Sequence, residues 1–347
     1  MRDFGYYWFH RAGHRIAFMW AVHGVHHGPN EFNYSVSLSQ GALQRWTEIF
    51  FYAPMALFFP VEVYLLMYPI AKIYGFFTHT RLFSGMGPLK YLMITPSLHR
   101  IHHASAPSPY IDKNYGEVFS IWDRMFGTYQ EEEYPVVYGT VEPIDTWDPF
   151  EANLTIWRKI FMKMSSTSSI IDKLKCFVMP PGWDPRSGKE YPLPDTTPWS
   201  SEKYDSKLPA RLALYVIVHY VIVMAAGIYL LVEYRRMKTY EMLFAVYAAL
   251  IYSLATLGKL YDHHPKFMYY ETVRLVVLAA VTWYFFSWVH PQITLIAVIF
   301  SVACWWFVWQ NRAVFAPESE AQWRDRVWIR VAGREFTEKL RQEEKNL

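Results

Sequence analysis

The sequence predicts an all-α, polytopic integral membrane protein with a histidine-rich helical core and a C-terminal block of four transmembrane helices. Three observations predict this fold class. The chain has 347 residues, of which 52% are hydrophobic, 19% aromatic and only 19% charged, so it is more apolar than soluble proteins usually are. Nine of its 13 histidines fall within the first 103 residues. Several later stretches are long and apolar enough to cross the hydrocarbon core of a bilayer.

The N-terminal histidines form three clusters at helical spacing, one HxxxH and two HxxHH, with a single histidine between the last two. They are His10 and His14, then His23, His26 and His27, then His79, and finally His99, His102 and His103. Residues three and four apart share one face of a helix, so each cluster can direct two or three imidazoles at one point. Burying such a set without a metal or a charged partner is costly. The clusters therefore predict metal binding, although a lone HxxxH or a single histidine also suits an ordinary helix.

The number of imidazoles predicts the kind of metal centre. One tetrahedral zinc uses at most four protein ligands, so eight or nine histidines exceed what it needs. Two six-coordinate iron ions that keep positions open for dioxygen would use them, although imidazole also suits copper, zinc and nickel. The Glu-x-x-His pattern of carboxylate-bridged di-iron bundles is absent from the sequence. We therefore expect a membrane-embedded di-iron oxygenase whose lipid substrate arrives from the bilayer.

The catalytic domain is expected to cover residues 1–165. Its apolar stretches 49–59 and 61–77 are separated by Pro60, and they predict either one kinked helix or two short helices beside the metal site. Polar residues near the clusters are candidates to accept the outer N–H of a ligating imidazole, or are ordinary caps and surface acids. These candidates are Asp3, Asp112, Asn114, Glu117 and Asp123. The aromatic and glycine-containing run 122–129 predicts a well-packed lid or re-entrant element.

The rest of the chain divides into a connector, an apolar block and a tail. Residues 166–208 are rich in Ser, Pro, Asp and Lys, which predicts a polar connector over the surface. The block at 209–311 is expected to hold four transmembrane helices, at 211–233, 242–257, 273–289 and 293–309. Residues 312–347 form a charged tail. The remaining histidines are expected to be structural, namely His219, His263, His264 and His290.

Cysteine usage and charge exclude other classes of protein. Cys176 and Cys304 are the only cysteines, so neither a disulfide framework nor a CxxC zinc ribbon is predicted. The net charge is +3, and no basic run is interleaved with aromatic residues, so no nucleic-acid partner is expected. Because the first ligand candidate stands only ten residues into the chain, we expect the sequence to be an N-terminally truncated form of a longer membrane protein.

These motifs resemble those of the fatty acid hydroxylase (sterol desaturase) superfamily of membrane di-iron enzymes. The resemblance covers residues 3 to 129 and includes all three histidine clusters. Its further carriers are Asp3, YYWFHR at 6–11, FTHT at 77–80, TPSLHR at 95–100, NYG at 114–116 and WDRMFGTY at 122–129. The resemblance implies that the eight clustered histidines, and His79 with them, are the catalytic ligands of two iron ions. It also implies a multi-pass protein of the endoplasmic reticulum membrane.

Within that superfamily the chain resembles the branch that cleaves the ether bond of alkylglycerols with tetrahydrobiopterin. The carriers are TPSLHR, EFNY at 31–34, PGWDP at 181–185 and the four apolar C-terminal stretches. Arg15 departs from this branch, in which an acid follows the second histidine. The resemblance implies that dioxygen and the reduced pterin hydroxylate the carbon beside the ether oxygen, which releases a fatty aldehyde and a glycerol derivative. It assigns no pterin-binding residue.

Two alternatives stay open at this point. One is a hydroxylase or desaturase of the same superfamily that acts on a sterol or a fatty acyl chain. The other is a truncated membrane protein without catalytic activity. In either enzymatic reading the partners are a lipid substrate, dioxygen and membrane lipid.

Overall fold

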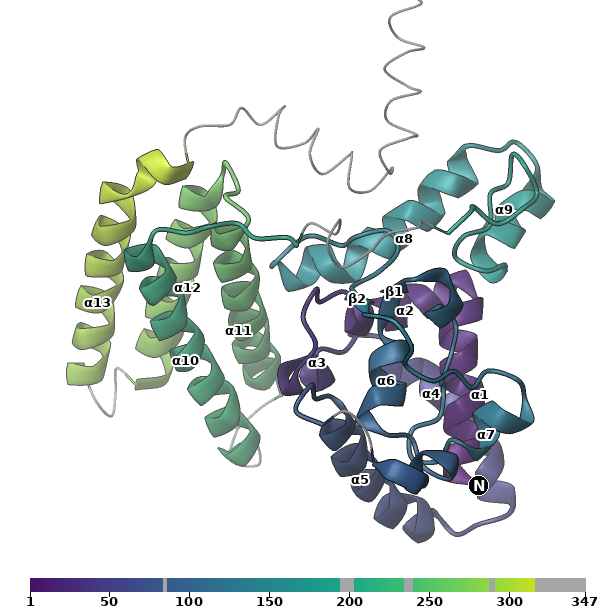
Figure 1. Cartoon of the computed structure of the whole chain (residues 1–347). Coiled ribbons are helices and arrows are strands. Elements are labelled where there is room, and N and C mark those ends of the chain that lie inside the picture. The colour runs from purple at the N-terminus through teal and green to yellow at the C-terminus, as the bar shows by residue number, and fades with distance from the viewer. Residues whose placement is uncertain (84–85, 194–202, 234–239, 287–290, 316–347) are drawn as a thin grey trace, which may run out of the picture. The chain divides into compact units, whose positions relative to one another are not determined.

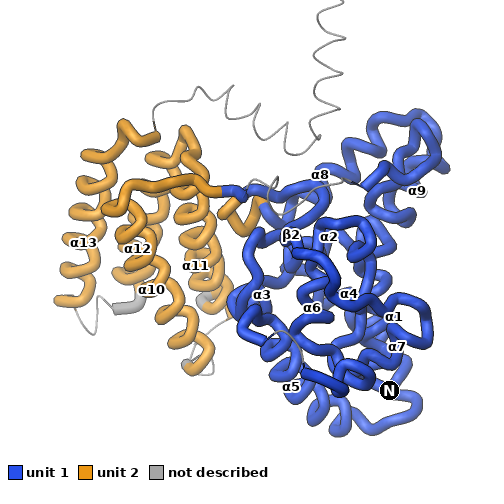
Figure 2. Tube along the Cα trace, viewed as in Figure 1, with its two compact units in different colours: residues 1–145, 152–204, 330–347 blue, residues 146–151, 205–329 orange. Residues whose placement is uncertain are grey.

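The computed structural model describes residues 1–83, 86–193, 203–233, 240–286 and 291–315, and most of them are helical (Figure 1). These described residues divide into two compact units (Figure 2). Unit 1 contains residues 1–145 and 152–204, and unit 2 contains residues 146–151 and 205–315. His290 and most of the predicted tail lie outside the described residues, and the described start of the tail forms a 3-10 turn, η5 (Arg312–Phe315).

Unit 1 begins with two helices, α1 (Arg2–Arg15) and α2 (Ala17–His27), that pack against each other. They are separated by Ile16 alone, whose extended backbone ends the first helix and starts the second. Gly13 of α1 faces the imidazole of His23 on α2, where a Cβ would lie 3.4 Å from the ring, at ordinary packing distance. The pair therefore brings the first two histidine clusters side by side.

The apolar region between the second and third clusters forms two separate helices rather than one kinked helix. They are α4 (Gln44–Tyr52), which continues into the 3-10 helix η1 (Ala53–Leu57), and α5 (Val61–Thr78). The break falls before Pro60, whose fixed φ suits the residue that precedes a helix. α4 starts five residues before the predicted apolar stretch 49–59, and its first turns contain the polar residues Gln44, Arg45 and Glu48. The short helix α3 (Tyr34–Leu38) precedes it and is capped by the Asn33 side chain.

The third cluster lies on a short helix followed by irregular chain. α6 (Pro96–His102) starts with proline at its first position, and the Thr95 hydroxyl accepts a hydrogen bond from the Leu98 amide. After it, β1 (Ala104–Ala106) pairs antiparallel with β2 (Val137–Tyr138), a two-stranded element that the all-α prediction did not include. The remaining short elements here are η2 (Gly87–Tyr91), η3 (Ser108–Tyr110) and α7 (Ile121–Met125).

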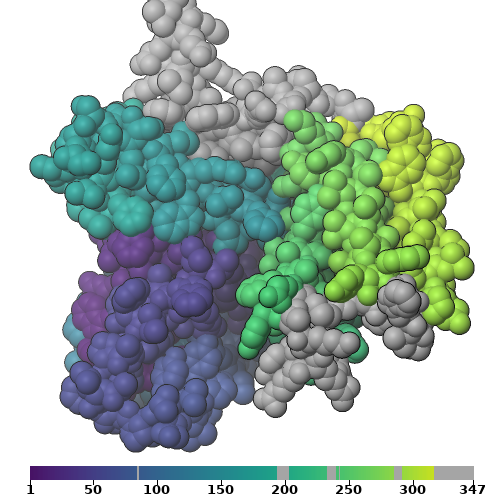
Figure 3. Space-filling model, turned by 180° about the vertical axis from the view of Figure 1, so that it is seen from behind, coloured from purple at the N-terminus to yellow at the C-terminus, as the bar shows by residue number. Residues whose placement is uncertain are grey.

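Two further helices cover one end of the α1–α2 pair. They are α8 (Pro149–Ser165) and α9 (Ile170–Val178), drawn in teal above the purple helices in Figure 3. The Ala17 amide donates to the Met179 carbonyl at 3.0 Å, and the rings of Phe18 and Phe177 stack at 5.2 Å. The predicted polar connector thus contains a helix, because the Ser169 hydroxyl caps a segment with apolar residues at helical spacing.

The described part of unit 2 forms four long helices, and three of them, as far as they are described, are long and apolar enough to cross a membrane. The four are α10 (Ala210–Glu233), α11 (Tyr240–Tyr261), α12 (Phe267–Phe286) and α13 (Pro291–Gln310), and the candidate spans are Ala210–Val232, Leu243–Tyr261 and Pro291–Gln310. Three of the four predicted spans are thus candidates in the structure, while the predicted span 273–289 extends beyond the described residues, which end at 286 in α12, and it stays a prediction. α12 carries Glu271 and Arg274 within its first half, and these charges lower its hydropathy.

Those two charges belong to a buried polar network that joins three helices of unit 2. Arg274 forms a salt bridge with Glu271 at 2.5 Å, and both side chains are fully buried. The Tyr215 hydroxyl donates to Glu271, and Arg274 donates to the Nδ1 atom of His219 at 3.1 Å. The sulfur of Cys304 lies 3.4 Å from the other nitrogen of His219. His219 is therefore part of a hydrogen-bonded cluster in unit 2, and is not among the nine histidines of the metal groups.

Candidate metal centre

All nine N-terminal histidines converge inside unit 1, and every one of them is buried. They form two groups, within each of which one nitrogen of every imidazole lies within 4.8 Å of the others. The first group is His10, His14, His23, His27 and His102, and the second is His26, His79, His99 and His103. The structure thus brings together every predicted ligand candidate, including the isolated histidine. That these residues bind metal stays a prediction.

Each HxxHH cluster divides its imidazoles between the two groups. On α2, His23 and His27 are one turn apart and face the first group, while His26 faces the second. On α6 and its C-cap the pattern is reversed, because His99 and His103 face the second group and His102 the first. Residues four apart share a helix face, whereas the residue between them is rotated away from it. Each of these two helices therefore contributes to both groups.

The outer nitrogen of four of the nine imidazoles is held by a backbone carbonyl. The four such contacts are His10 Nδ1 to Tyr115 O at 2.8 Å, His26 Nδ1 to Ser39 O at 2.8 Å, His79 Nδ1 to Gly75 O at 2.6 Å and His102 Nδ1 to Lys113 O at 2.9 Å. A carbonyl oxygen can only accept, so Nδ1 must carry the proton in each case. The Nε2 atom is then left with a free lone pair, which is the form that binds a metal.

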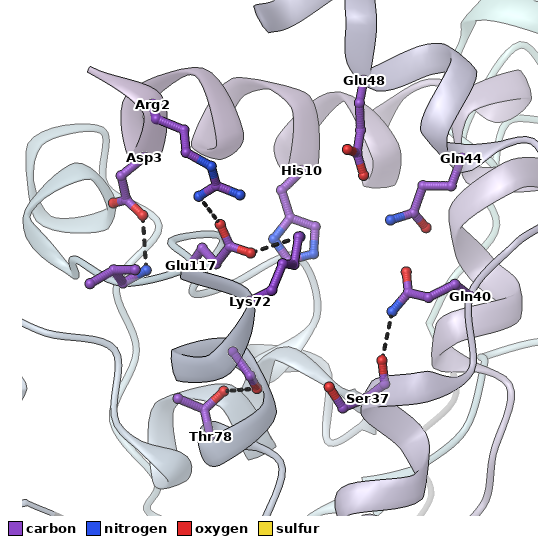
Figure 4. A network of polar contacts seen from close by, with 12 residues as sticks. Arg2, Asp3, His10, Ser37, Gln40, Gln44, Glu48, Lys72, Thr78 and Glu117 are labelled. Atoms are coloured by element: carbon purple, nitrogen blue, oxygen red, sulfur yellow. Dashed lines mark hydrogen bonds and ion pairs between the residues drawn. The ribbon is translucent and has the colours of Figure 1, made fainter. Parts of the chain in front are cut away.

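Two side chains do the same for other imidazoles. Gln44 Oε1 lies 3.2 Å from His23 Nδ1, and Asp112 Oδ1 lies 3.5 Å from His14 Nδ1. Asp112 was among the predicted partners, but Gln44 was not. The signal that could have found it is the spacing of Gln40, Gln44 and Glu48, three polar residues four apart just before the apolar stretch 49–59. Figure 4 shows the side chains of Gln40, Gln44 and Glu48 directed toward the same space.

The other predicted partners do not contact the imidazoles, and they shape the loop that does. Asp3 accepts hydrogen bonds from the Val118 amide at 2.9 Å and from the Trp122 indole at 2.9 Å. Asp123 accepts from the amides of Tyr115 at 2.7 Å and Gly116 at 2.9 Å. These carboxylates fix residues 115–122, and so the carbonyl of Tyr115 is held in place for His10.

Asn114 and Glu117 complete that loop. Asn114 has a φ of 54°, a left-handed conformation that asparagine tolerates, and its amide donates to the Leu98 carbonyl at 3.0 Å. Glu117 pairs with Arg2 and with Lys72 (Figure 4). Burial alone would raise the pKa of Glu117, but the two neighbouring cations outweigh it and hold the pKa below its usual value. Residues 114–120 therefore form a loop fastened to α1 and α5, and the predicted lid or re-entrant run 122–129 begins within the short helix α7.

The interior around the imidazoles favours their neutral form. Burial, followed by repulsion from the His79 imidazole, lowers the pKa of His26 to about 3. Burial also lowers the pKa of His79 to about 4. Neutral histidines with fixed Nδ1 protons therefore present lone pairs to one another, and Nε2 of His10 lies only 3.1 Å from Nε2 of His23. Two facing lone pairs repel each other unless a cation lies between them, so this donor set fits a metal ion.

Several nitrogens of these groups also lack any hydrogen-bond partner among the described residues. These are Nε2 of His14, His102 and His103 and Nδ1 of His99. Buried polar atoms are nearly always paired, and an orphaned one calls for an unseen partner. A metal ion at each group would supply that partner for the three Nε2 atoms.

Comparison with known proteins gives these groups a family context. The family model described as "Fatty acid hydroxylase" matches residues 1–128. The alkylglycerol monooxygenase of Xenopus tropicalis is 34% identical over 279 residues, which are 79% of this chain and 62% of that protein. The human alkylglycerol monooxygenase is 33% identical over 304 residues, which are 86% of this chain and 67% of that protein. The chain belongs to the fatty acid hydroxylase family.

A third member of the family, the alkylglycerol monooxygenase of Danio rerio, is 31% identical over 85% of this chain and 66% of its own length. The chain thus spans about two thirds of the length of these curated relatives. No solved structure matches it. The family match contains all nine histidines, so both groups lie within the part of the chain that the fatty acid hydroxylase family shares.

A cavity of about 170 Å³ reaches the first histidine group in this family member. It is bounded by α2, α8, α9 and the loops beside them, and its inner wall includes His14, His27 and His102. Arg15 lies at the same cavity, where it donates to Asp112 at 2.7 Å. The cavity therefore gives small molecules a path to the imidazoles. Arg15, at the position where the alkylglycerol-cleaving branch has an acid, lies beside that path.

Proposed function

We propose that this chain is a monooxygenase of the endoplasmic reticulum membrane that cleaves the ether bond of alkylglycerols. In the proposal two iron ions are the metal cofactor, dioxygen is the oxidant and tetrahydrobiopterin is the reductant. The observation that carries it is the pair of buried histidine groups with converging lone pairs. Similarity to three proteins named alkylglycerol monooxygenase, at 31–34% identity over most of the chain, supports the choice of substrate.

The two groups fit two ions. The first ion would be held by His10, His14, His23, His27 and His102, and the second by His26, His79, His99 and His103. When bound, the iron pair supplies the means to oxidise an unactivated C–H bond with dioxygen, which acid–base side chains cannot do. The protein's own part is to orient the imidazoles through the carbonyls of residues 39, 75, 113 and 115. Burial of all nine keeps bulk water away from the reaction.

The proposed reaction balances as a monooxygenation. One oxygen atom of O2 enters the C–H bond beside the ether oxygen, and the other leaves as water with two electrons from the reduced pterin and two protons. The product is a hemiacetal. Its C–O bond to the glycerol breaks as the hydroxyl proton is lost, which gives a fatty aldehyde and free glycerol hydroxyl.

The test is aldehyde release from a 1-O-alkylglycerol by membranes that contain the chain, with and without tetrahydrobiopterin. His102→Ala is expected to abolish release and to lower the iron content, because it removes one of the first-group imidazoles. His263→Asn is the matched control. His263 lies in a turn of unit 2 with a φ of 51°, which asparagine also adopts. Full activity in His102→Ala, or none in the unmodified chain with iron bound, would contradict the proposal.

A further inference from the structure

Unit 1 contains a second hollow that the histidine groups do not line. It has a volume of about 640 Å³ and lies among the start of α1, α4, η1 and the first half of α5. Its walls are mainly apolar and include Met55, Val61, Tyr64 and Leu65. A volume in this range is typical of pockets that enclose a small organic ligand. The hollow can therefore hold a molecule with a substantial apolar part.

Its inner end carries buried polar atoms that have no partner. Arg2 and Tyr52 both line the hollow and are only 7% and 8% exposed. Among the described residues, the Nε and Nη2 atoms of Arg2 and the hydroxyl of Tyr52 have no hydrogen-bond partner. The Arg2 guanidinium also lies over the rings of Tyr52 and Tyr68, at 5.6 and 5.3 Å, but stacking leaves its N–H groups unused. Buried donors of this kind indicate a missing acceptor.

The neighbouring carboxylates do not provide that acceptor. Glu117 takes the Nη1 atom of Arg2 and the ammonium of Lys72. Both carboxylate oxygens of Glu48 accept a hydrogen bond, each at 2.9 Å, from the guanidinium of Arg45 one turn away on α4. The three cations here outnumber the two acids. A ligand that completes this end must therefore bring acceptor oxygens, as a hydroxyl-bearing or ether-bearing head group does.

The polar end of the hollow lies on the side of the first histidine group. Glu48 lines the hollow, and Gln44, one helical turn or about 5.4 Å earlier on α4, contacts His23. Figure 4 shows Glu48, Gln44, Lys72 and His10 around the same space. A molecule in the hollow with its polar end inward would thus extend toward the imidazoles.

The outer end opens onto an apolar surface. Val61 and Leu65 line the hollow and are 59% and 62% exposed. Farther along α5, Ile70 and Ile73 are exposed as well. An exposed apolar strip of this length is costly in water and suits contact with lipid chains. A lipid can therefore reach the hollow without crossing a polar surface.

We infer that this hollow binds the alkyl chain of the lipid substrate, with the head-group oxygens at Arg2 and Tyr52. The inference rests on the proposed function for the class of lipid, and it adds where the lipid lies. Burial of a methylene is worth about a fourfold gain in affinity, so the depth of the hollow sets the preferred chain length. Met55, Val61, Tyr64 and Leu65 are then specificity-determining residues.

The kinetic test fills the hollow. Ala56 lines it, and Ala56→Trp is expected to shift the preferred alkylglycerol to shorter chains and to raise KM for a hexadecyl substrate about tenfold. KM for the pterin and the iron content should not change. Ile170→Trp is the matched control, because Ile170 lies on α9, is 69% exposed and does not line the hollow. An unchanged chain-length profile in Ala56→Trp would overturn the inference.

A second variant separates ligand binding from folding. The Tyr52 hydroxyl has no hydrogen-bond partner among the residues that the structure describes, so Tyr52→Phe should leave thermal stability unchanged or slightly higher. The KM for the alkylglycerol should still rise about two- to tenfold, the value of one hydrogen bond. Loss of stability without a change in this KM would show that the hydroxyl has a structural role only, and would contradict the inference.

A binding measurement without turnover distinguishes this inference from the proposed function. A 1-O-alkylglycerol with a photoreactive diazirine in its chain is irradiated with the protein in phosphatidylcholine nanodiscs, and the labelled peptide is identified. Labelling is expected within residues 52–68, with displacement by unlabelled alkylglycerol. Labelling there in a chain that releases no aldehyde would support the inference while the proposed function fails. Labelling elsewhere, or none displaced by alkylglycerol, would overturn it even if aldehyde is released.

Discussion

Replacing Arg274 by methionine should strongly destabilise unit 2. Arg274 and Glu271 are both fully buried, and the arginine donates to Glu271 at 2.8 Å through Nε and at 2.5 Å through Nη2. Without the arginine, the buried Glu271 carboxylate keeps the Tyr215 hydroxyl as its one hydrogen-bond donor among the described residues. Breaking a buried ion pair in this way costs about 3–5 kcal/mol. For a helical unit of this size the midpoint of thermal unfolding should fall on the order of 10 °C.

The two free cysteines allow the units to be followed separately. Cys304 lies in unit 2 and Cys176 in unit 1, and both are buried. A thiol-reactive fluorogenic dye added during heating of the detergent-solubilised protein therefore reports unfolding of unit 2 when Cys176 is replaced by serine. Arg274→Met should shift this transition.

The double variant Glu271→Gln and Arg274→Met tests the physical reason. It removes both charges, so it should lose only about 1–2 kcal/mol, well below the loss in Arg274→Met alone. A double variant as unstable as the sum of the two single variants would refute the reasoning, because the two residues would then act independently. A shift below about 2 °C in Arg274→Met would refute it as well.

Three further predictions concern unit 1. Gln44→Leu should lower the affinity for iron about 10–100-fold, measured by iron retention against a chelator, because Gln44 accepts a hydrogen bond from His23. Gln40→Leu is the control, since His26 keeps its hydrogen bond to the Ser39 carbonyl in that variant. Equal losses of affinity in the two variants would contradict the reasoning. Burial lowers the pKa of His26 to about 3 and that of His79 to about 4, so iron affinity should be nearly constant from neutral pH to about pH 5. The metal-free unit, in contrast, should lose stability as the pH falls below 6.5, the pKa of a histidine in the unfolded chain, since only the unfolded chain takes up protons there. A steep fall in iron affinity below pH 6.5 would show that the imidazoles are solvated. Asp123→Asn should destabilise unit 1 by about 1–3 kcal/mol, because an amide side chain cannot accept hydrogen bonds from Tyr115, Gly116 and Thr128 together. The reactivity of the Cys176 thiol during heating measures this loss, and an unchanged midpoint of thermal unfolding would refute the prediction.

Local spacing was enough to predict that histidines four residues apart belong to the same group, as His10 and His14, His23 and His27, and His99 and His103 do. Residues three and four apart share a helix face whatever the tertiary fold, so the HxxxH and HxxHH patterns could be read directly. The division of each HxxHH cluster between two groups could not be read in the same way. It depends on the rotation of α2 and α6 about their axes, which is fixed by long-range packing such as the contact of Gly13 with His23.

The partners of the imidazoles were harder to predict for a different reason. Most of them are backbone carbonyls, as at Tyr115 and Gly75, and a carbonyl leaves no trace in the sequence. The acids that looked like direct partners, Asp3 and Asp123, act one step away by fixing the loop. In unit 2, the apolar pattern predicted four helices but not that α12 would carry a buried ion pair, because Arg274 finds its partners on a separate helix as well as its own.

The shared use of α2 and α6 by both histidine groups has a consequence for metal loading. An ion bound to His23 and His27 fixes the rotation of α2 and thereby also fixes His26 in the other group. Likewise, an ion bound to His99 and His103 fixes His102. In the proposed two-ion arrangement, binding of the first ion thus already orders the helices that form the second site. The second ion then binds at a lower cost in conformational entropy, which makes loading cooperative. A preparation with an average of one ion per chain should therefore be a mixture of empty and doubly loaded molecules.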